Sequence, residues 1–352
     1  TEVAGLTWRR NGRTVTNDNR PLEDINETPP MPYSLIPVSA YAGKSGELNY
    51  LSSRGCPGSC EFCAVKCVHR EQWTGLAPER MLRELGELVA RHGIRHVHFT
   101  DTDFFADIQR VEEFCRLKID RALPLTWGAL GRVANLHGRP TAFFHLIEKA
   151  GCRFLEAGGE SGSARILSMY HKEITPSDLE TFTEKLSGTG IDLMMNWMLG
   201  PPGETRGELY VTYEVARRLR CIMPRIRYLF YRFTPIPGSA MGEAAISRGV
   251  ARPGTPMELP EYAFYVRDPG MPWLSRWQER RVKRAFYYYF PLVFREPRAC
   301  EPVLKWGVIR MLRKIAVLRL AIHCLALPVD WWLYWLCTRL GLLAKGRLYA
   351  WR

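Results

Sequence analysis

Four cysteines fall within the segment RGCPGSCEFCAVKC at 54–67 of this 352-residue chain. Cys56, Cys60 and Cys63 have the spacing C-x3-C-x2-C, and Cys67 follows four residues later. Three thiolates this close together can ligate one [4Fe–4S] cubane and leave its fourth iron open. Zinc is the competing metal, with Cys67 or His69 as a fourth ligand, although structural zinc usually takes two separated C-x2-C pairs. Inert core thiols are the third interpretation, and the spacing favours the cubane.

The bulk composition fits a folded protein of a reducing compartment. The chain is 46% hydrophobic, which is enough for one large α/β domain, and its formal net charge is +13. The first 30 residues lack the continuous apolar stretch of an export signal, so we expect a cytoplasmic location in which clustered thiols more often bind metal than pair. The positive charge suits a nucleic acid, an anionic membrane surface or a phosphorylated substrate without choosing among them.

Short apolar runs alternate with amphipathic stretches between Leu48 and Ser239. The runs predict strands, and the stretches between them predict helices. Strands are predicted at 48–53, 96–100, 125–130, 153–158, 192–198 and 227–233, and helices at 78–92, 108–117, 141–150, 163–170, 177–188 and 204–220. Such alternation implies right-handed crossovers and a parallel sheet. Six units are fewer than the eight of a closed barrel, so the expected fold is α/β, a partial (β/α)6 barrel.

The unusual residues follow the predicted strands directly. After five of the six strands stand the cysteine loop, DTDFF, GGESGS, GPPGET and TPIPGSAM. In parallel α/β folds the C-terminal ends of the strands form one edge, where sites are built. We therefore expect these five loops to converge on one rim.

Three regions are expected along the chain. Residues 1–47 are rich in Pro, Asn and Arg and predict an extended connector, whereas 48–245 predict the barrel. Residues 246–352 predict a helical, basic and Trp-rich region. From Gly307 to Arg352 there are eight Lys or Arg, one acid (Asp330) and four Trp, and the longest uncharged stretches are too short for a transmembrane helix. We expect this amphipathic tail to contact a membrane surface, with a helical cap on the barrel or an oligomer contact as the alternative.

The cysteine loop resembles the C-x3-C-x-aromatic-C signature of the radical S-adenosylmethionine (SAM) enzymes, with Phe62 as the aromatic residue. The resemblance implies that Cys56, Cys60 and Cys63 ligate a [4Fe–4S] cluster and that Phe62 packs near the adenine of SAM. It also implies that SAM chelates the open iron and is cleaved to a 5′-deoxyadenosyl radical, with a reductant such as flavodoxin or ferredoxin supplying the electron. The fold it implies is the same partial barrel.

The other rim loops resemble one subgroup of that family, which includes cobalamin-dependent methylases, magnesium-protoporphyrin cyclase relatives and methylthiotransferases. The matching segments are LEAGGESGSARILSMYHKEIT, MLGPPGET and FTPIPGSAM, while GRVANLH has Asn135 where the subgroup often has Asp. Residues 3–33 resemble the connector that follows a cobalamin-binding domain. No D-x-H-x-x-G cobalamin signature occurs in the chain. Cobalamin is therefore expected to be bound mainly by a domain outside it.

Six further residues are candidates for contact with the cosubstrate: Phe62, Asp101, Arg132, Gly158, Glu160 and Pro201. Asp101 and Asp103 follow a strand and could accept the methionine ammonium, with Asp101 favoured. The resemblance assigns Glu160 to the SAM amino group or ribose, and Gly158 gives close backbone approach. Arg132 is expected to pair with Glu160 or the ligand carboxylate. In the turn at 200–203, helix N-terminal amides could hold a ligand hydroxyl or carboxylate. The alternatives are exposed turn acids, a surface Arg and a purely structural turn.

The predicted function is that of a radical SAM enzyme that methylates or cyclises an apolar or lipid-like small molecule with cobalamin at the inner face of the membrane. One alternative is an RNA-modifying enzyme of the methylthiotransferase type, which the charge supports. A second cysteine triad and an appended RNA-binding domain are not seen in the sequence, so nucleic acid is not an expected partner. The other alternative is a non-catalytic, membrane-associated metal-binding protein.

Overall fold

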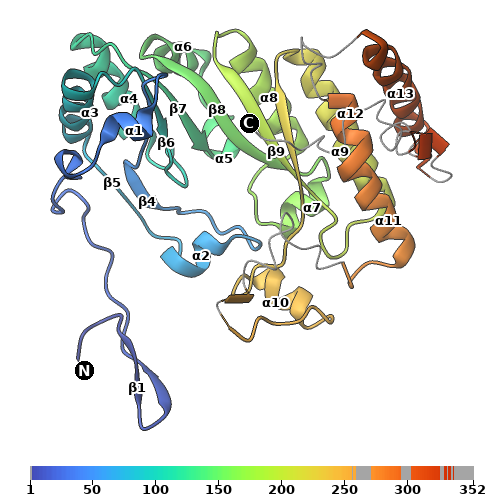
Figure 1. The fold of residues 1–352 in the computed structure, drawn as a ribbon, viewed down its shortest axis with the longest axis horizontal. Coiled ribbons are helices and arrows are strands. Elements are labelled where there is room, and N and C mark those ends of the chain that lie inside the picture. The colour runs from blue at the N-terminus through green and yellow to red at the C-terminus, as the bar shows by residue number, and fades with distance from the viewer. Residues whose placement is uncertain are drawn as a thin grey trace.

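A six-stranded sheet with all strands parallel forms the centre of the molecule (Figure 1). The computed structural model describes residues 2–255, 257–258, 271–294, 303–325, 329–330, 332–333 and 336. The sheet order is β10-β9-β8-β7-β6-β3, so each crossover leads to the neighbouring strand. The strands are β3 (Glu47–Tyr50), β6 (His96–Phe99), β7 (Thr126–Gly131), β8 (Cys152–Glu160), β9 (Asp192–Leu199) and β10 (Arg227–Arg232). The predicted parallel sheet of a partial barrel is confirmed.

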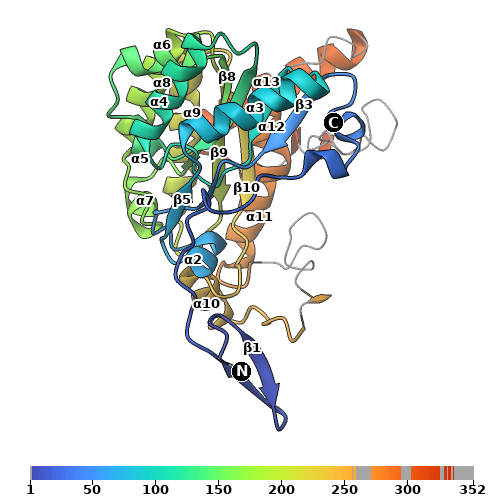
Figure 2. The same cartoon turned by 90° about the vertical axis from the view of Figure 1, so that its left-hand side faces the viewer.

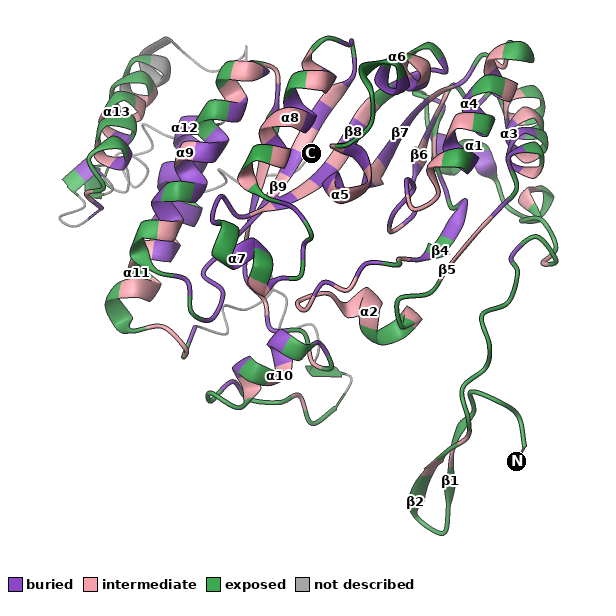
Figure 3. Ribbon diagram, turned by 180° about the vertical axis from the view of Figure 1, so that it is seen from behind, coloured by how far each residue is buried: buried purple, intermediate pink, exposed green. Residues whose placement is uncertain are grey.

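Helices from the crossovers cover one face of this sheet (Figure 3). They are α3 (Pro78–His92), α4 (Ile108–Asp120), α5 (Val133–Leu136), α6 (Thr141–Lys149), α7 (Ala164–Met169), α8 (Pro176–Ser187) and α9 (Arg206–Ile222). Helix α3 has the predicted bounds because Pro78 fits its first turn and Gly93 ends it with φ of +66°. Helices α8 and α9 begin at capping boxes, in which Thr175 and Thr205 bond reciprocally to the third residue of their helix.

The two faces of the sheet differ in burial. On β8, Leu155 and Ala157 are buried against the helices, whereas Glu156, Gly158 and Glu160 are partly buried. Successive strand residues point to opposite faces, so Glu156 and Gly158 share the face away from the helices. The register shifts between Gly158 and Glu160, and Oε1 of Glu160 lies over Gly158 on that same face. This open face runs along the sheet and ends at the edge where the rim loops begin.

The predicted strand 48–53 is in fact two short strands. Strand β3 ends at Tyr50, and β4 (Ser53–Gly55) pairs with β5 (Trp73–Gly75) in an antiparallel ribbon. Gly55 has φ of +85°, and a Cβ there would lie 2.1 Å from the carbonyl oxygen of Gln72. Only glycine allows this approach. The ribbon encloses the cysteine loop and α2 (Ala64–His69).

The N-terminal region is more ordered than the expected extended connector. It contains the hairpin β1 (Thr7–Arg10) and β2 (Arg13–Thr16), then a 3-10 turn η1 (Tyr33–Leu35) and α1 (Val38–Ala42). The hairpin differs from the expected extended connector. Its turn is Asn11-Gly12, with φ of 49° and 77°, and this residue pair is typical of two-residue hairpin turns. Figure 2 shows this hairpin projecting beyond the barrel.

Helix α10 (Ala240–Ile246) follows the last strand of the sheet. The described part of the C-terminal region contains α11 (Arg276–Arg284), a π-helical segment η3 (Ala285–Tyr289), α12 (Phe290–Phe294) and α13 (Val303–Ala321). Helix α12 packs on the edge strand, with the rings of Phe290 and Phe230 4.8 Å apart. Trp331, Trp335 and Trp351 of the predicted membrane contact lie outside the described residues. Within the described part of the chain, no helix has both the length and the apolar character needed to cross a membrane.

Candidate functional site

The three predicted metal ligands lie in the loop between β4 and α2, beyond the C-terminal end of β3. Cys60 is buried, Cys56 and Cys63 are half-buried, and all three are free thiols. The backbone N–H of Cys63 donates to the carbonyl of Cys60 at 3.1 Å. Cys67 is exposed on α2, one helical turn after Cys63. One loop thus carries all three predicted ligands, and the fourth cysteine lies at the surface.

Two backbone hydrogen bonds fix this loop to distant parts of the barrel rim. Glu61 donates its N–H to the carbonyl of Tyr170 at 3.1 Å, and Met241 donates its N–H to the carbonyl of Glu61 at 3.1 Å. Tyr170 ends α7 and Met241 belongs to α10. The loops after β3, β8 and β10 therefore meet, as the sequence predicted.

Two positively charged side chains lie near the thiols of Cys56 and Cys60. Burial raises the pKa of the Cys56 and Cys60 thiols, and the nearby charges of Arg132 and, for Cys60, Lys172 oppose that rise. Iron binding requires deprotonated thiols, which these two cations favour. They also offset part of the negative charge that three bound thiolates would add.

The donor set fits a cubane better than a single metal ion. Among the described residues, no three His, Cys, Asp or Glu side chains are grouped closely enough to hold one ion. Thiolates on a cubane bind three different iron atoms and stand farther apart than the ligands of one ion. The loop offers three free thiols with two neighbouring cations. A cubane with one open iron requires no fourth protein ligand, so this donor set suits it.

Glu160 and Lys172 form a buried ion pair beside this loop, with Nζ 2.8 Å from Oε1. Gly158 makes room for the pair, because a Cβ at that position would lie 2.1 Å from Oε1 of Glu160. Nζ of Lys172 lies 5.8 Å from the ring centroid of Phe62, whose ring packs edge-on against Tyr170 at 5.0 Å. Predicted residues from strand four and the cysteine loop are thus brought into one cluster.

The backbone around this ion pair has unusual conformations. Glu160, His171 and Glu173 have φ of 59°, 51° and 58°, a region that residues other than glycine rarely adopt. His171 and Glu173 flank Lys172 on both sides, and Lys172 is 6% exposed. Strained positions of this kind cluster at ligand sites, where the surrounding fold holds them in place. No sequence signal indicates this conformation.

Arg132 pairs with Glu173, with Nη2 2.6 Å from Oε2, and its expected pairing with Glu160 does not occur. Lys172, in the loop after α7, pairs with Glu160 instead. The guanidinium packs on the cysteine loop, where a Cβ on Gly58 would lie 2.6 Å from Cζ. Nε of Arg132 is buried without a hydrogen-bond partner in the described part of the chain. An unpartnered buried donor of this kind is a point at which a ligand oxygen could bind.

Asp101 is 2% exposed and both its oxygens already accept hydrogen bonds. Oδ1 accepts the N–H groups of Ser52 at 2.6 Å and Ser53 at 3.0 Å, and Oδ2 accepts the Ser52 hydroxyl. Arg110 completes the network by donating Nη2 to the Ser52 carbonyl at 2.9 Å. These bonds tie the end of β6 to the chain entering the cysteine loop, so Asp101 positions that loop.

Asp103 lies close enough to the cysteine loop to act electrostatically on the Cys56 thiol. It is fully buried, accepts from Asn135 Nδ2 at 2.8 Å and from the backbone N–H of Arg132 at 3.4 Å, and adds to the electrostatic field at Cys56. Burial raises the pKa of its carboxyl to about 6. Asn135, which stands where the resembling subgroup often has Asp, acts here as a hydrogen-bond donor to a carboxylate.

Pro201 belongs to a turn that is held by a buried carboxylate. Thr205 caps α9, and Glu204 folds back so that Oε2 accepts the N–H of Gly200 at 2.8 Å. Gly200 also accepts a bond from Trp273 Nε1 at 2.9 Å. Burial raises the pKa of Glu204 to about 8. These bonds give the turn a structural role.

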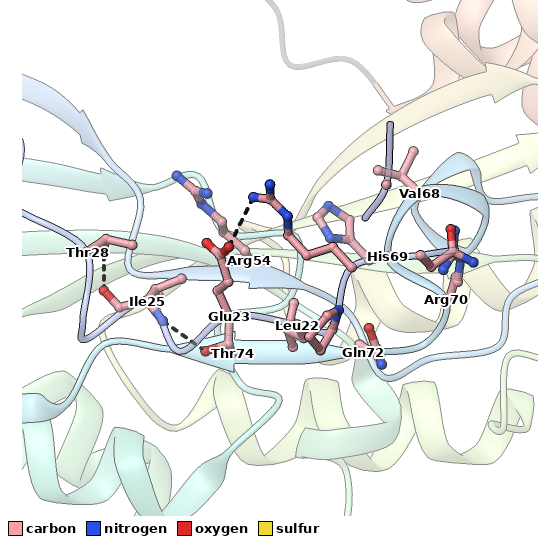
Figure 4. Close-up of a pocket in the computed structure, with 14 residues that line it drawn as sticks. Leu22, Glu23, Ile25, Thr28, Arg54, Val68, His69, Arg70, Gln72 and Thr74 are labelled. Atoms are coloured by element: carbon pink, nitrogen blue, oxygen red, sulfur yellow. Dashed lines mark hydrogen bonds and ion pairs between the residues drawn. The ribbon is translucent and has the colours of Figure 1, made fainter. Parts of the chain in front are cut away.

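A cavity of about 360 Å³ separates the N-terminal connector from the cysteine-bearing segment (Figure 4). Arg54, His69 and Arg70 line it from the cysteine-bearing side, and Glu23 lines it from the connector. Glu23 pairs with Arg20 at 3.1 Å. The cavity beside α2 is therefore lined by more positively than negatively charged side chains.

Residues 50–216 match the Radical SAM superfamily. This segment, which is just under half of the chain, is therefore similar to the radical SAM domain. A radical SAM domain implies a [4Fe–4S] cluster and SAM as cofactors.

Curated relatives are methyltransferases and cyclases. An uncharacterized methyltransferase of Pyrococcus horikoshii is 28% identical over 251 residues, which are 70% of this chain and 53% of that protein. The anaerobic magnesium-protoporphyrin IX monomethyl ester cyclase of Rubrivivax gelatinosus is 28% identical over 165 residues, which are 47% of this chain and 29% of that protein. The chain thus spans about half the length of the first relative and less of the second.

Solved structures share the fold. The cobalamin-dependent S-adenosylmethionine radical enzyme OxsB, with aqua-cobalamin bound, superposes with a TM-score of 0.65 at 15% identity, covering 96% of this chain and 56% of that one. The radical S-adenosylmethionine methyltransferase TsrM from Kitasatospora setae, with tryptophan and a SAM analogue bound, gives 0.52 at 22% identity, covering 60% and 41%.

Proposed function

We propose that Cys56, Cys60 and Cys63 hold the [4Fe–4S] cluster and that SAM binds beside it, against Phe62 and the Glu160–Lys172 pair. The observation that carries this proposal is the meeting of the free thiols with a buried ion pair at the rim, where Lys172 and Arg132 both act on the Cys60 thiol. When bound, the cluster would supply the electron that cleaves SAM to a 5′-deoxyadenosyl radical.

The residues around the thiols have chemistry that suits the amino-acid end of SAM. Glu160 offers a carboxylate to an ammonium, and Arg132 offers a buried Nε donor to a carboxylate. Phe62 offers an aromatic surface to the adenine. Asp101 acts through Ser52 and Ser53, and Pro201 through the turn held by Glu204, so we propose positioning roles for both. Gly158 keeps the space that the ion pair needs.

The proposed reaction is C-methylation or cyclisation of a small molecule with cobalamin. The curated relatives are methyltransferases and a cyclase, and the OxsB structure contains aqua-cobalamin. We propose that residues 1–47 connect the barrel, 48–245, to a cobalamin-binding domain outside the present chain, and that 246–352 form a C-terminal helical region. Asn26 supports a connector of fixed position, because its side chain bonds Gly75 at 3.1 Å and Ala77 at 2.8 Å.

Two associations complete the proposal. The basic surface beside α2 would receive an acidic reductant such as flavodoxin or ferredoxin. The tail would touch the inner face of the membrane, which is supported by exposed Leu318, Ile322 and Trp332 near Arg313 and Lys314. An apolar or lipid-like substrate would suit that location.

Two rival roles make different predictions. An RNA-modifying enzyme would bind transfer RNA in a salt-dependent way, whereas a non-catalytic metal-binding protein would not cleave SAM.

Anaerobic reconstitution followed by electron paramagnetic resonance tests the cluster. We expect the reduced protein to show a [4Fe–4S]⁺ signal and to release 5′-deoxyadenosine from SAM when dithionite is present. Replacing Cys56, Cys60 and Cys63 by Ala should abolish both, whereas Cys67→Ala should preserve them because Cys67 is exposed and outside the triad. An unchanged signal in the triple variant would refute the proposal.

A further inference from the structure

Glu156 lies on the open face of the sheet, in line with the proposed cofactor site. It precedes Gly158 by two positions on β8, so the two residues share the face away from the helices. Oε1 of Glu160 lies over the same face, 2.1 Å from the position of a Cβ on Gly158. Its register partners are Leu130 on β7 and Met194 on β9. A carboxylate thus stands in the middle of the sheet between two apolar neighbours.

Asn196 joins Glu156 across the neighbouring strand. Its Nδ2 donates to Oε1 of Glu156 at 2.7 Å, and it lies opposite Gly158 in the register. Oδ1 of Asn196 is buried and has no hydrogen-bond partner among the residues that the structure describes. A buried acceptor left without a donor is unfavourable unless a ligand or water supplies one.

Glu156 differs from the other acids of this face in its surroundings. Lys172 neutralises Glu160 at 2.8 Å, and Arg227 lies 3.7 Å from Asp192. Arg227 is two strands from Glu156 in the register and is directed over the ring of Phe154. Within the described ranges no Lys, Arg or His lies within ion-pair distance of Glu156. Its charge is therefore available to a ligand.

Tyr231 lies near both the Glu156 carboxylate and the proposed cofactor site. It lies on β10 within electrostatic range of both Glu156 and Glu160, whose charges add to burial in raising the pKa of its phenol to about 12. Lys172, the partner of Glu160, in turn acts on the Cys60 thiol. A molecule bound over Glu156 would therefore be adjacent to the place where we propose that SAM binds.

We infer that Glu156 and Asn196 form the polar end of the substrate site and select a substrate whose apolar body carries a protonated nitrogen. This inference rests on the proposed function and narrows its substrate class. The free oxygens of the two side chains accept hydrogen bonds, so a ligand must bring donors. An ammonium or amidinium supplies both the donors and the opposite charge, while Leu130 and Met194 contact its apolar part.

Binding of three matched probes to the reconstituted protein with SAM tests this inference. The probes are benzylammonium, neutral benzyl alcohol and anionic benzoate, followed by ligand-observed nuclear magnetic resonance. We expect benzylammonium to bind about tenfold more tightly than benzyl alcohol, since a charge-assisted hydrogen bond is involved, and benzoate to bind least. Glu156→Gln keeps the side-chain shape and should abolish the preference, whereas Glu156→Asp should retain part of it. Glu214→Gln, at a surface acid paired with Arg217, is the matched control.

The outcomes separate this inference from the proposed function. Equal binding of the three probes, or an undiminished preference in Glu156→Gln, overturns the inference. Formation of 5′-deoxyadenosine without substrate is measured on the wild-type protein and on Glu214→Gln, whose surface acid lies outside the proposed sites. If the wild-type protein forms none, the proposed function fails, while the probe preference still reports on Glu156 itself. A thermal unfolding curve for each variant verifies that it is folded.

Discussion

Nζ of Lys172 lies 2.8 Å from Oε1 of Glu160 in a site where the two side chains are only 8% and 12% exposed. Glu160 ends β8, and Lys172 lies in the loop after α7. The pair faces the aromatic ring and the thiols of the cysteine loop, so it connects the sheet edge to the proposed cluster site.

Replacing Lys172 by Met should leave the Glu160 carboxylate buried without its partner. Breaking one side of a buried pair typically destabilises a protein by about 3–5 kcal/mol, which urea denaturation would measure. Adding Glu160→Gln should restore much of that loss because no unpaired charge then remains. Arg116→Met, which removes a surface pair with Glu112, should change stability by less than about 1 kcal/mol. If Lys172→Met and Arg116→Met lose the same free energy of unfolding, the buried pair stabilises the protein no more than the surface pair does.

Gly158→Ala should displace the same ion pair without removing either charge. The new Cβ would lie 2.1 Å from Oε1 of Glu160 and 2.7 Å from Nζ of Lys172. Both atoms end flexible side chains and can move, so we expect a folded protein with weakened SAM binding in equilibrium dialysis. Gly86→Ala is the control, since its Cβ would meet no atom within 4 Å, and it should stabilise α3 by about 1 kcal/mol. Unaltered SAM affinity in Gly158→Ala would argue against a ligand at this pair.

Asp101→Asn should loosen the entrance to the cysteine loop. The amide replaces one acceptor oxygen with a donor that faces the N–H groups or hydroxyl of Ser52 and Ser53. The lost and unpaired bonds should destabilise the protein by about 1–3 kcal/mol in urea denaturation. Asp120→Asn, at the exposed end of α4, should change little. If the two substitutions are equivalent, the network around Ser52 is not a positioning device.

Glu204 should make stability depend on pH. Burial raises the pKa of its folded-state carboxyl from 4.5 to about 8, so the folded protein retains a proton that the unfolded chain releases. The contribution of Glu204 is fully present below pH 4.5 and is lost as pH rises through about 8. Glu204→Gln keeps an acceptor for the Gly200 N–H and should flatten this part of the profile, measured as unfolding free energy from pH 5 to 9. A wild-type slope that survives in the variant would assign the titration to another group.

The sequence alone predicted the parallel sheet, the bounds of α3 and the convergence of loops after successive strands. These features follow from local periodicity, from helix end signals such as Pro78 and Gly93, and from the rule that parallel strands share one C-terminal edge. The cysteine spacing likewise lies within one short segment, so its chemistry follows from residue types and spacing alone. The Asn11-Gly12 turn is an equally local signal, but the Pro, Asn and Arg content around it favours an extended connector and conceals the hairpin.

The tertiary structure decided which charges meet. Arg132 pairs with Glu173 and Lys172 with Glu160, although each acid was available in sequence to either cation. The choice depends on the left-handed backbone at His171 and Glu173 and on the space above Gly158, which are set by contacts between strands and loops distant in the chain. The position of Glu156, away from the cations of the described residues, is defined in the same way, because the neighbours of a side chain in space are set by the packing of the whole sheet.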